Sequence, residues 1–189
     1  PEPVRKPWRT PQFLQDRPLT GREKGSATHL FMQFVRYESC TTREGIRQEL
    51  VRMQAEKFLT PRQAEAVDAE KILALFSSEL GNRILHADSL RREFKFSILA
   101  DAAAYDPAAV GEQVMLQGVV DCFWQEPDGI VILDFKTDYI HGDLQQKAAR
   151  YAPQLRAYAQ ALSRIYQCPV KKTVLYFFSA GREVEIDPE

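Results

Sequence analysis

Gln117-Gly118-Val119-Val120-Asp121, followed after a turn by Leu133-Asp134-Phe135-Lys136, is the stretch that decides the fold of this 189-residue chain. Residues 114–124 and 130–136 are mostly apolar and rich in β-branched side chains, which favours two strands. Glu126-Pro127-Asp128-Gly129 lies between them and is typical of a turn. The stretch therefore predicts a β-hairpin whose apolar strands are interrupted by a few charged residues.

Three of those charged residues, Asp121, Asp134 and Lys136, are expected on one face of the hairpin. A four-residue loop at 126–129 places Asp121 opposite Asp134, and a two-residue loop at 128–129 places it opposite Lys136. Side chains alternate with a period of two along a strand, so all three share a face in either register. A three-residue loop or a bulge would break this arrangement.

Two aspartates that face each other across a strand pair repel, and apolar neighbours make the repulsion costlier. A divalent cation bound by Asp121 and Asp134 removes the conflict, and carboxylate oxygens suit Mg²⁺ or Mn²⁺ better than softer metals. Lys136 would point into the same site, where it can hold an attacking water or steady the charge on a phosphate. A single Asp-x-Lys is more often a solvated strand face, but its pairing with Asp121 across one hairpin favours the metal site.

The rest of the chain predicts helices before and after the hairpin and one strand on either side. The five prolines of residues 1–20 indicate an extended lead-in. Apolar spacing predicts helices at residues 23–38, 43–58, 60–81 and 143–166, with a kink or a fresh start at Pro153 in the last of these. Alternation predicts strands at residues 92–98 and 174–178. This order predicts an α/β (α+β) domain in which helices pack on a mixed sheet with a three-strand meander.

Composition indicates a globular protein of one domain, with 44% hydrophobic and 27% charged residues. Cys40, Cys122 and Cys168 are too scattered for a metal or disulfide motif, which predicts reduced thiols and a cytoplasmic location. Neither a signal peptide nor an apolar run of membrane-spanning length is present, so no membrane partner is expected. The net charge of −1 does not by itself indicate nucleic-acid binding, but an acidic site can offset a local basic patch.

The pattern Gly-Val-Val-Asp, a turn, then Leu-Asp-Phe-Lys-Thr-Asp resembles the PD-(D/E)xK nuclease superfamily, and more narrowly its RecB-type exonuclease branch. The resemblance implies a restriction-endonuclease-like core with an added N-terminal helical part. It also implies that Asp121 and Asp134 ligate the metal and that Lys136 is catalytic.

Further matches to that family concern residues outside the hairpin. Gly25 to His29 resembles the family's early helix, whose histidine ligates metal. Gln154 and Tyr158 resemble its Gln-xxx-Tyr motif, and they share a helix face, although Tyr158 also fits a core stripe. The substrate contacts expected around this motif are Gln154, Tyr158, Tyr151, Arg150 and Arg156. Glu93 resembles a glutamate on the family's first strand and is given a supporting role.

From about Pro11 onward the sequence resembles the C-terminal nuclease domains of the AddA family, the helicase–nuclease subunits of bacterial AddAB. The resemblance implies two partners, DNA and an AddB-type subunit, with residues 1–20 a linker from a helicase region and residues 21–189 the nuclease domain. A chain that begins with Pro1 agrees with that expectation. Four cysteines bind an iron–sulfur cluster in several related nucleases, and three cannot, so no cluster is expected.

The function predicted from the sequence is therefore metal-dependent hydrolysis of DNA, by an exonuclease acting on the 3′-ended strand in double-strand break repair and recombination. The main alternative is a non-catalytic module that keeps the nuclease fold to bind DNA or a partner protein. A phosphatase or transferase ranks last, because no nucleotide-binding loop or cysteine nucleophile is present.

Overall fold

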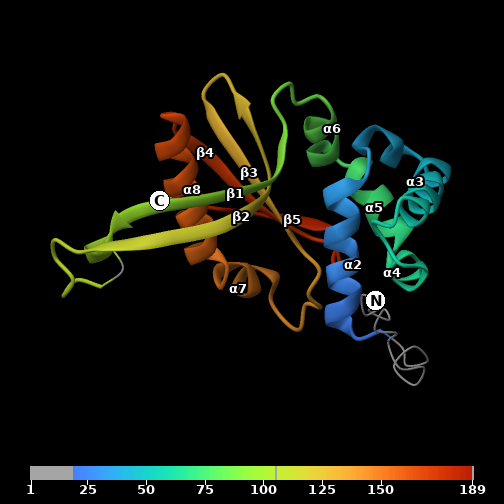
Figure 1. Ribbon diagram of the computed structural model, residues 1–189, viewed down its shortest axis with the longest axis horizontal. Coiled ribbons are helices and arrows are strands. Elements are labelled where there is room, and N and C mark those ends of the chain that lie inside the picture. Colours follow the sequence, from blue (N-terminus) through green and yellow to red (C-terminus); the bar gives the residue numbers. More distant parts are fainter. Residues whose placement is uncertain (1–18, 105, 189) are drawn as a thin grey trace, which may run out of the picture.

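A five-stranded mixed sheet runs through the centre of the computed structural model, which describes residues 19–104 and 106–188 (Figure 1). The strands lie in the order β1-β2-β3-β4-β5, and every neighbouring pair is antiparallel except β3 and β4, which are parallel. Their bounds are Arg91–Asp101, Gln113–Glu126, Gly129–Lys136, Val170–Phe177 and Arg182–Ile186. The predicted mixed sheet with its meander is confirmed, and β5 is a strand that the sequence patterns did not predict.

The parallel pairing of β3 and β4 requires a crossover, because a tight turn can join only antiparallel strands. Two helices supply it, α7 (Leu144–Ala149) and α8 (Ala152–Tyr166). Pro153 lies in the first turn of α8, where proline is tolerated. Of the two outcomes expected at Pro153, the structure therefore has the fresh helix start.

The helices before the sheet form a second layer on its other side. They are α2 (Gly21–Phe34), the 3₁₀ helix η1 (Tyr37–Thr41), α3 (Arg43–Ala55), α4 (Pro61–Ala66), α5 (Ala69–Phe76) and α6 (Glu79–Leu85). Thr20 caps α2 through a capping box with Glu23. The rest of the predicted lead-in falls on residues 1–18, outside the described part of the chain.

The single helix predicted from Thr60 to Gly81 is wrong, because the structure has three short helices there. Asp68 and Ser78 accept hydrogen bonds from backbone N–H groups and start α5 and α6 as N-caps. Gly81 lies inside α6 instead of ending a helix. A Cβ there would lie 2.1 Å from the carbonyl oxygen of Leu75, so only glycine permits this close turn.

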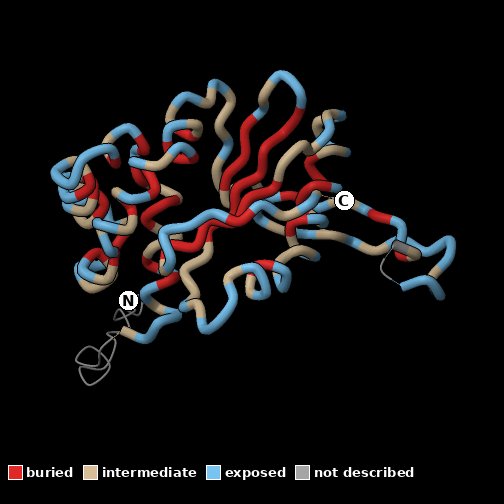
Figure 2. Tube along the Cα trace, turned by 180° about the vertical axis from the view of Figure 1, so that it is seen from behind, coloured by how far each residue is buried: buried red, intermediate tan, exposed pale blue. Residues whose placement is uncertain are grey.

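Two hydrophobic cores flank the sheet, and β3 contributes to both. Val131, Leu133 and Phe135 pack toward α2 to α6, whereas Ile130 and Ile132 pack toward α8. Figure 2 shows the buried residues concentrated in these central strands. Because β3 is buried on both faces, any charged side chain on it must find a partner inside the protein.

The hairpin between β2 and β3 adopts one of the two expected registers. Cys122 pairs with Leu133 and Gln125 with Ile130, which is the register that was expected to place Asp121 opposite Asp134, although the pairing itself ends at Cys122 and Leu133. The loop is shorter than the one assumed for that register, since Glu126 also pairs with Gly129. Gly129 has a φ of 147°, and a Cβ there would lie 2.7 Å from the carbonyl oxygen of Pro169.

Side-chain alternation reverses in β1 at Glu93. Arg92 lies on the α2 side, where its guanidinium donates to the carbonyl oxygens of Met32 and Val35. Phe94, two residues on, packs in the core on the α8 side instead. Residues two apart normally share a face, and the left-handed backbone of Glu93, with a φ of 51°, accounts for the reversal.

The same reversal occurs in β2 at the position opposite. Val120 packs in the core on the α8 side and Cys122 in the core on the α2 side. Asp121 lies between them, across from Glu93 in the β1–β2 register. β1 and β2 therefore contain an irregularity of the kind that interrupts side-chain alternation. Alternation alone does not explain how Asp121 is placed relative to Asp134.

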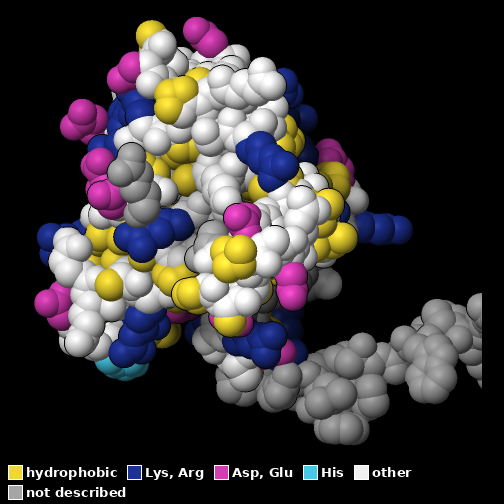
Figure 3. Space-filling model, turned by 90° about the vertical axis from the view of Figure 1, so that its left-hand side faces the viewer, with side chains coloured by type: hydrophobic (Ala, Val, Ile, Leu, Met, Phe, Trp, Pro, Cys, Tyr) yellow, Lys and Arg dark blue, Asp and Glu magenta, His cyan; other side chains and the backbone are white. Residues whose placement is uncertain are grey.

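Beyond this point β1 and β2 extend away from the rest of the sheet as a paired arm (Figure 1). Leu99 and Met115 on this arm are exposed. Figure 3 faces that end of the molecule and shows basic, acidic and hydrophobic side chains interspersed over it. On this face, therefore, no single sign of charge dominates.

Two further expectations concern cysteines and membranes. The three cysteines are free thiols, of which Cys40 and Cys122 are buried, and burial raises the pKa of Cys40 to about 12. No helix in the described ranges is long and apolar enough to span a lipid bilayer.

Glu126 anchors the hairpin to both neighbouring layers. Its carboxylate lies 2.8 Å from the guanidinium of Arg83 on α6 and 2.6 Å from the ammonium of Lys171 on β4. It also accepts a hydrogen bond from the indole of Trp124. Hydrogen bonds from Lys171, Arg83 and Trp124 lower the pKa of Glu126 to about 2.

Replacing this carboxylate should destabilise the fold in a pH-dependent way. We expect Glu126→Gln to lower the free energy of unfolding at pH 7 by roughly 1–2 kcal/mol, as for hydrogen bonds to a charged group. The folded pKa is depressed from 4.5, so this stabilisation is present above pH 4.5 and is lost as the pH falls toward 2. Urea titrations from pH 7 to 2 measure it. Glu185→Gln is the control, because Glu185 is exposed and water screens its ion pair with Lys172. Equal losses in the two variants would contradict the assignment.

Candidate active site

The site forms where β2 separates from β3. The pairing of the two strands ends at Cys122 and Leu133, after which β2 continues with β1 and β3 with β4. Asp121 Oδ2 then accepts a hydrogen bond of 2.8 Å from the backbone N–H of Phe135. The Asp121 side chain therefore lies in the gap between the strands and replaces a lost ladder hydrogen bond.

Asp134 and Lys136 extend from β3 toward α8. Asp134 is 3% exposed, and its Oδ2 lies 2.6 Å from the Lys136 ammonium. This ion pair is the one polar side-chain contact of that buried oxygen within the described residues. Burial raises the pKa of Asp134, and the charge of Lys136 opposes the rise.

Asp121 and Asp134 influence each other's ionisation. Burial raises the pKa of Asp121 to about 7, and the negative charge of Asp134 is the next largest cause. His29 and the Phe135 N–H act in the opposite direction. The site thus holds two carboxylates that are costly to ionise together without an added positive charge.

His29 comes to the site from α2. Its Nε2 lies 2.8 Å from the carbonyl oxygen of Phe135 and 3.7 Å from Asp121 Oδ2. Its Nδ1 lies 3.1 Å from the carbonyl oxygen of Gly25, one turn earlier. Both partners are carbonyl oxygens, so a neutral His29 donates a hydrogen bond to only one of them. In the tautomer with its proton on Nδ1, the ring donates to the Gly25 carbonyl oxygen, and Nε2 keeps a lone pair for a metal in place of the Phe135 contact.

The approach of α2 depends on Gly25. A Cβ at this position would lie 2.4 Å from Oγ1 of Thr137, the residue that follows β3. A larger residue would therefore force the Thr137 side chain to rotate or α2 to move from the strand, and a movement of α2 would carry His29 with it.

Gln154 and Tyr158 lie on the face of α8 that meets Lys136. The Lys136 ammonium donates to Gln154 Oε1 at 3.0 Å, and Gln154 Nε2 donates to the Tyr158 hydroxyl at 2.6 Å. Tyr158 is buried, and burial raises its pKa to about 12. The functional and core interpretations of Tyr158 are thus compatible, since its ring is packed while its hydroxyl holds Gln154.

A further contact to Lys136 comes from Tyr151. The Lys136 ammonium lies 4.1 Å from the centre of the Tyr151 ring, a cation–π distance. The Tyr151 hydroxyl donates to Asp138, which also pairs with Lys147 at 3.1 Å. Asp138 follows Lys136 by two residues, and this role for it was not predicted from the sequence.

Arg150 and Arg156 are the other two residues that were expected to contact the substrate. Arg150 is exposed and ends α7 beside Tyr151. Arg156 is exposed on α8, and residues two apart on a helix do not share a face, so it points away from the side that carries Gln154. The structure therefore does not bring Arg156 to the site.

Glu93 on β1 lies across from Asp121 on β2 in the register of the two strands. Its left-handed backbone is costly for a residue with a side chain. Burial raises the pKa of Glu93, and the charge of His29 opposes the rise. Glu93, His29 and Asp121 all line one groove, and the supporting role of Glu93 stays a prediction.

The donor atoms at the site fit a divalent cation by their chemistry. The buried Asp134 Oδ2 is paired only with Lys136 within the described ranges, and Asp121 and His29, which lie 3.7 Å apart, are close enough for electrostatic interactions with Asp134. Within those same ranges, however, no three acidic, histidine or cysteine side chains are already grouped as a metal site. Asp134 pairs with Lys136 instead, so the metal assignment to His29, Asp121 and Asp134 stays a prediction.

Comparisons with known proteins agree with this geometry. The family model described as the PD-(D/E)XK nuclease superfamily matches residues 5–188. The chain belongs to this nuclease superfamily. It is also 41% identical over 196 residues to an ATP-dependent helicase/nuclease subunit of Bacillus cereus (strain Q1), and 39% identical over 183 residues to that of Clostridium novyi (strain NT). These matches cover 97% and 93% of the chain but only 16% and 15% of the relatives.

A glycine near the site has a packing role that was not predicted from the sequence. A Cβ on Gly118 would lie 2.8 Å from the Phe96 ring and 2.9 Å from the Tyr158 ring. Gly118 thus makes room for Tyr158 over β2, three residues before Asp121. Spacing alone could not reveal this contact, because its partners lie on β1 and α8.

The position of α2 can be tested through Gly25. We expect Gly25→Ala to lower the free energy of unfolding by roughly 1–3 kcal/mol, as for an overpacked core, despite alanine's higher helix propensity. Gly21→Ala is the matched control on the same helix, because a Cβ there meets nothing within 4 Å. Thr137→Ala in the Gly25→Ala background should recover part of the loss. Thermal melts measure all three, and equal stability of the two glycine variants would refute the contact.

Proposed function

We propose that this chain is a divalent-metal-dependent deoxyribonuclease that hydrolyses DNA phosphodiester bonds. The observation that carries the proposal is the carboxylate pair, buried Asp134 and partly buried Asp121, beside the partly buried Lys136 in a nuclease-superfamily fold. Such a pair destabilises the metal-free protein and is useful only if a cation joins it.

Asp121, Asp134 and His29 would hold Mg²⁺ or Mn²⁺. When bound, the metal supplies a Lewis acid and lowers the pKa of a water. Oxygen ligands with one imidazole are compatible with either ion. The hydrogen bond from the Phe135 N–H holds Asp121 beside β3, and the contact of His29 Nδ1 with the Gly25 carbonyl oxygen can hold the imidazole while Nε2 binds metal.

Lys136 would supply the fixed positive charge of the reaction. Its ammonium is held by Gln154 Oε1 and the Tyr151 ring while it contacts Asp134. From there it can orient an attacking water or neutralise charge that develops on the phosphate. Gln154, Tyr158 and Tyr151 therefore act first on Lys136, and we assign them and Arg150 a secondary role along the substrate strand.

The finer assignments rest on the relatives. Their description as ATP-dependent helicase/nuclease subunits supports a nuclease domain within a larger helicase–nuclease. On that basis we propose exonucleolytic cleavage of the 3′-ended strand during double-strand break repair in the cytoplasm. An AddB-type subunit would be the protein partner and DNA the substrate.

A substitution that removes charge without changing shape tests the carboxylate pair. We expect Asp134→Asn to reduce Mg²⁺- or Mn²⁺-dependent cleavage of DNA by more than about a hundredfold, since losing even an outer-shell group costs 10–100-fold. The same change removes the repulsion with Asp121. It should therefore raise the melting temperature without metal by roughly 2–4 °C per kcal/mol relieved.

The exposed Asp88, in Asp88→Asn, is the control and should change neither quantity. Calorimetric titration with Mn²⁺ should also show weaker binding to Asp134→Asn than to the parent. Parental cleavage by Asp134→Asn would refute the active-site assignment. DNA binding by the parent with no cleavage in either metal would favour the non-catalytic module.

The link from Tyr158 to Lys136 gives a second test. Tyr158→Phe removes the hydroxyl that accepts from Gln154 and keeps the buried ring. We expect cleavage to fall by about 2- to 10-fold, equivalent to one hydrogen bond, with a melting temperature close to that of the parent. Tyr166→Phe on the same helix is the control, because Tyr166 contributes ring contacts to Phe94 and Phe123. A loss of rate that simply follows a loss of stability would favour a packing role alone.

A further inference from the structure

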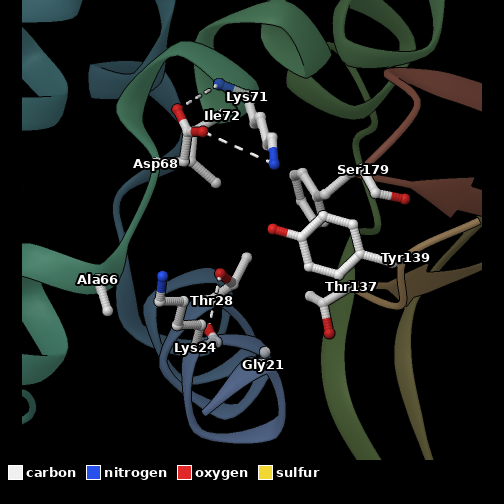
Figure 4. A pocket seen from close by; sticks show the side chains of 12 residues that line it. Gly21, Lys24, Thr28, Ala66, Asp68, Lys71, Ile72, Thr137, Tyr139 and Ser179 are labelled. Atoms are coloured by element: carbon white, nitrogen blue, oxygen red, sulfur yellow. Dashed lines mark hydrogen bonds and ion pairs between the residues drawn. The ribbon is translucent and has the colours of Figure 1, made fainter. Parts of the chain in front are cut away.

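A cavity of about 150 Å³ lies next to the candidate active site and has no role in the proposed chemistry. Its walls come from the first turns of α2, the start of α5, the segment after β3 and the end of β4 (Figure 4). Three of its lining residues are Lys24, Lys71 and Tyr139. None of the three was assigned a function from the sequence.

The cavity is locally basic. Lys24 on α2 and Lys71 on α5 both direct their ammonium groups into it, from different walls (Figure 4). Asp68 lies 3.7 Å from the Lys71 ammonium and offsets one of the two charges. One positive charge is left in a space lined by backbone and hydroxyl groups, which suits a phosphate, for which lysine is a common ligand.

Tyr139 stands at the boundary between this cavity and the site. It is 64% exposed, and its hydroxyl points into the cavity (Figure 4). Tyr139 also lines the neighbouring pocket that contains His29, together with Gly21, Gly25 and Thr137. That pocket in turn shares His29 with the groove over Asp121 and Glu93. The three pockets therefore adjoin one another, from the two lysines past Tyr139 to Asp121 and Glu93.

The combination of lysines and an exposed aromatic ring is typical of surfaces that bind single-stranded nucleic acid. Such surfaces track the backbone with positive charge and stack bases on aromatic rings. Lys24 and His29 are five residues apart on α2, which is about 7.5 Å along the helix axis. At roughly 3.4 Å of axial rise per nucleotide, that separation corresponds to one or two nucleotides.

We propose that this cavity binds the phosphate of a nucleotide adjacent to the one being cleaved, with Tyr139 stacking on its base. The ligand is single-stranded DNA, and the inference rests on the proposed nuclease function for the neighbouring site. Lys24 and Lys71 hold the phosphate. The subsite fixes where the strand lies before cleavage and requires no metal of its own.

Equilibrium binding without divalent metal tests the subsite separately from catalysis. The probe is a fluorescein-labelled oligothymidylate of about 12 nucleotides, within the usual site size, titrated with the chain in EDTA at several salt concentrations. The double substitution Lys24→Ala/Lys71→Ala should weaken binding by about tenfold at low salt. It should also reduce the slope of log K against log[salt] by roughly 0.7, equivalent to one phosphate contact.

Tyr139 is tested in the same assay. Tyr139→Ala should weaken binding by about tenfold with an unchanged salt slope, whereas Tyr139→Phe keeps the ring and should bind like the parent. Arg47→Ala is the control, because Arg47 is exposed on α3, does not line the cavity and should leave both quantities unchanged.

Parental affinity and slope in the double lysine variant would overturn the phosphate site, and parental affinity in Tyr139→Ala would overturn the stacking. A parent chain that does not bind the oligonucleotide would overturn the whole subsite. Metal-dependent cleavage and its loss in Asp134→Asn are measured independently, so failure of the subsite is distinguishable from failure of the proposed function.

Discussion

After β2 departs from β3, Phe135 is left with a backbone N–H and C=O that face the gap. Both groups of one strand residue point the same way, and unpaired backbone groups are costly when buried. Asp121 accepts from the N–H, and His29 Nε2 lies against the carbonyl oxygen. The separation of the strands thus fixes the positions of two side chains that come from β2 and α2. The rest of the site depends on that gap, because Asp134 and Lys136 flank Phe135 on the same strand.

This arrangement concentrates negative charge where water is scarce. Asp134 is almost fully buried, and its charge contributes to raising the pKa of Asp121. Lys136 offsets part of the charge, but it needs contacts of its own to remain in place, which Gln154 and Tyr151 provide. The fold therefore tolerates a destabilised centre by surrounding it with two well-packed cores. This pattern is expected where function and stability conflict.

Much of the hairpin that carries the site could be predicted from the sequence, because its pattern involves residues that are close together in the chain. Alternation and turn residues predict β2, β3 and two alternative registers, one of which the structure adopts. They could not predict the reversal of side-chain alternation at Glu93 and Asp121. It arises from the left-handed backbone of Glu93, a conformation that glutamate as a residue type does not indicate. The break-up of the helix after Thr60 follows from caps at Asp68 and Ser78, which compete with an apolar periodicity that runs through all three helices. Gly25 and Gly118 allow close contacts with residues distant in the sequence, and Gly81 allows one with the preceding turn of the chain. The spacing of residue types along the sequence does not indicate such contacts.

The two helical layers contribute separate parts of the site and reach it through separate cores. α2 presents His29 from the core that contains Val131 and Leu133, whereas α8 presents Gln154 from the core that contains Ile130 and Ile132. A displacement of α2 should therefore alter the histidine and leave Lys136 held, and a displacement of α8 should do the reverse. β2, β3 and β4 all contribute side chains to both cores, and β3 is buried on both faces from end to end apart from Lys136. The precision of the site depends on β3 because this strand carries Asp134 and Lys136 between the two cores. The sequence signal is strong there for the same reason, since the residues of β3 fill two cores and also supply the chemistry.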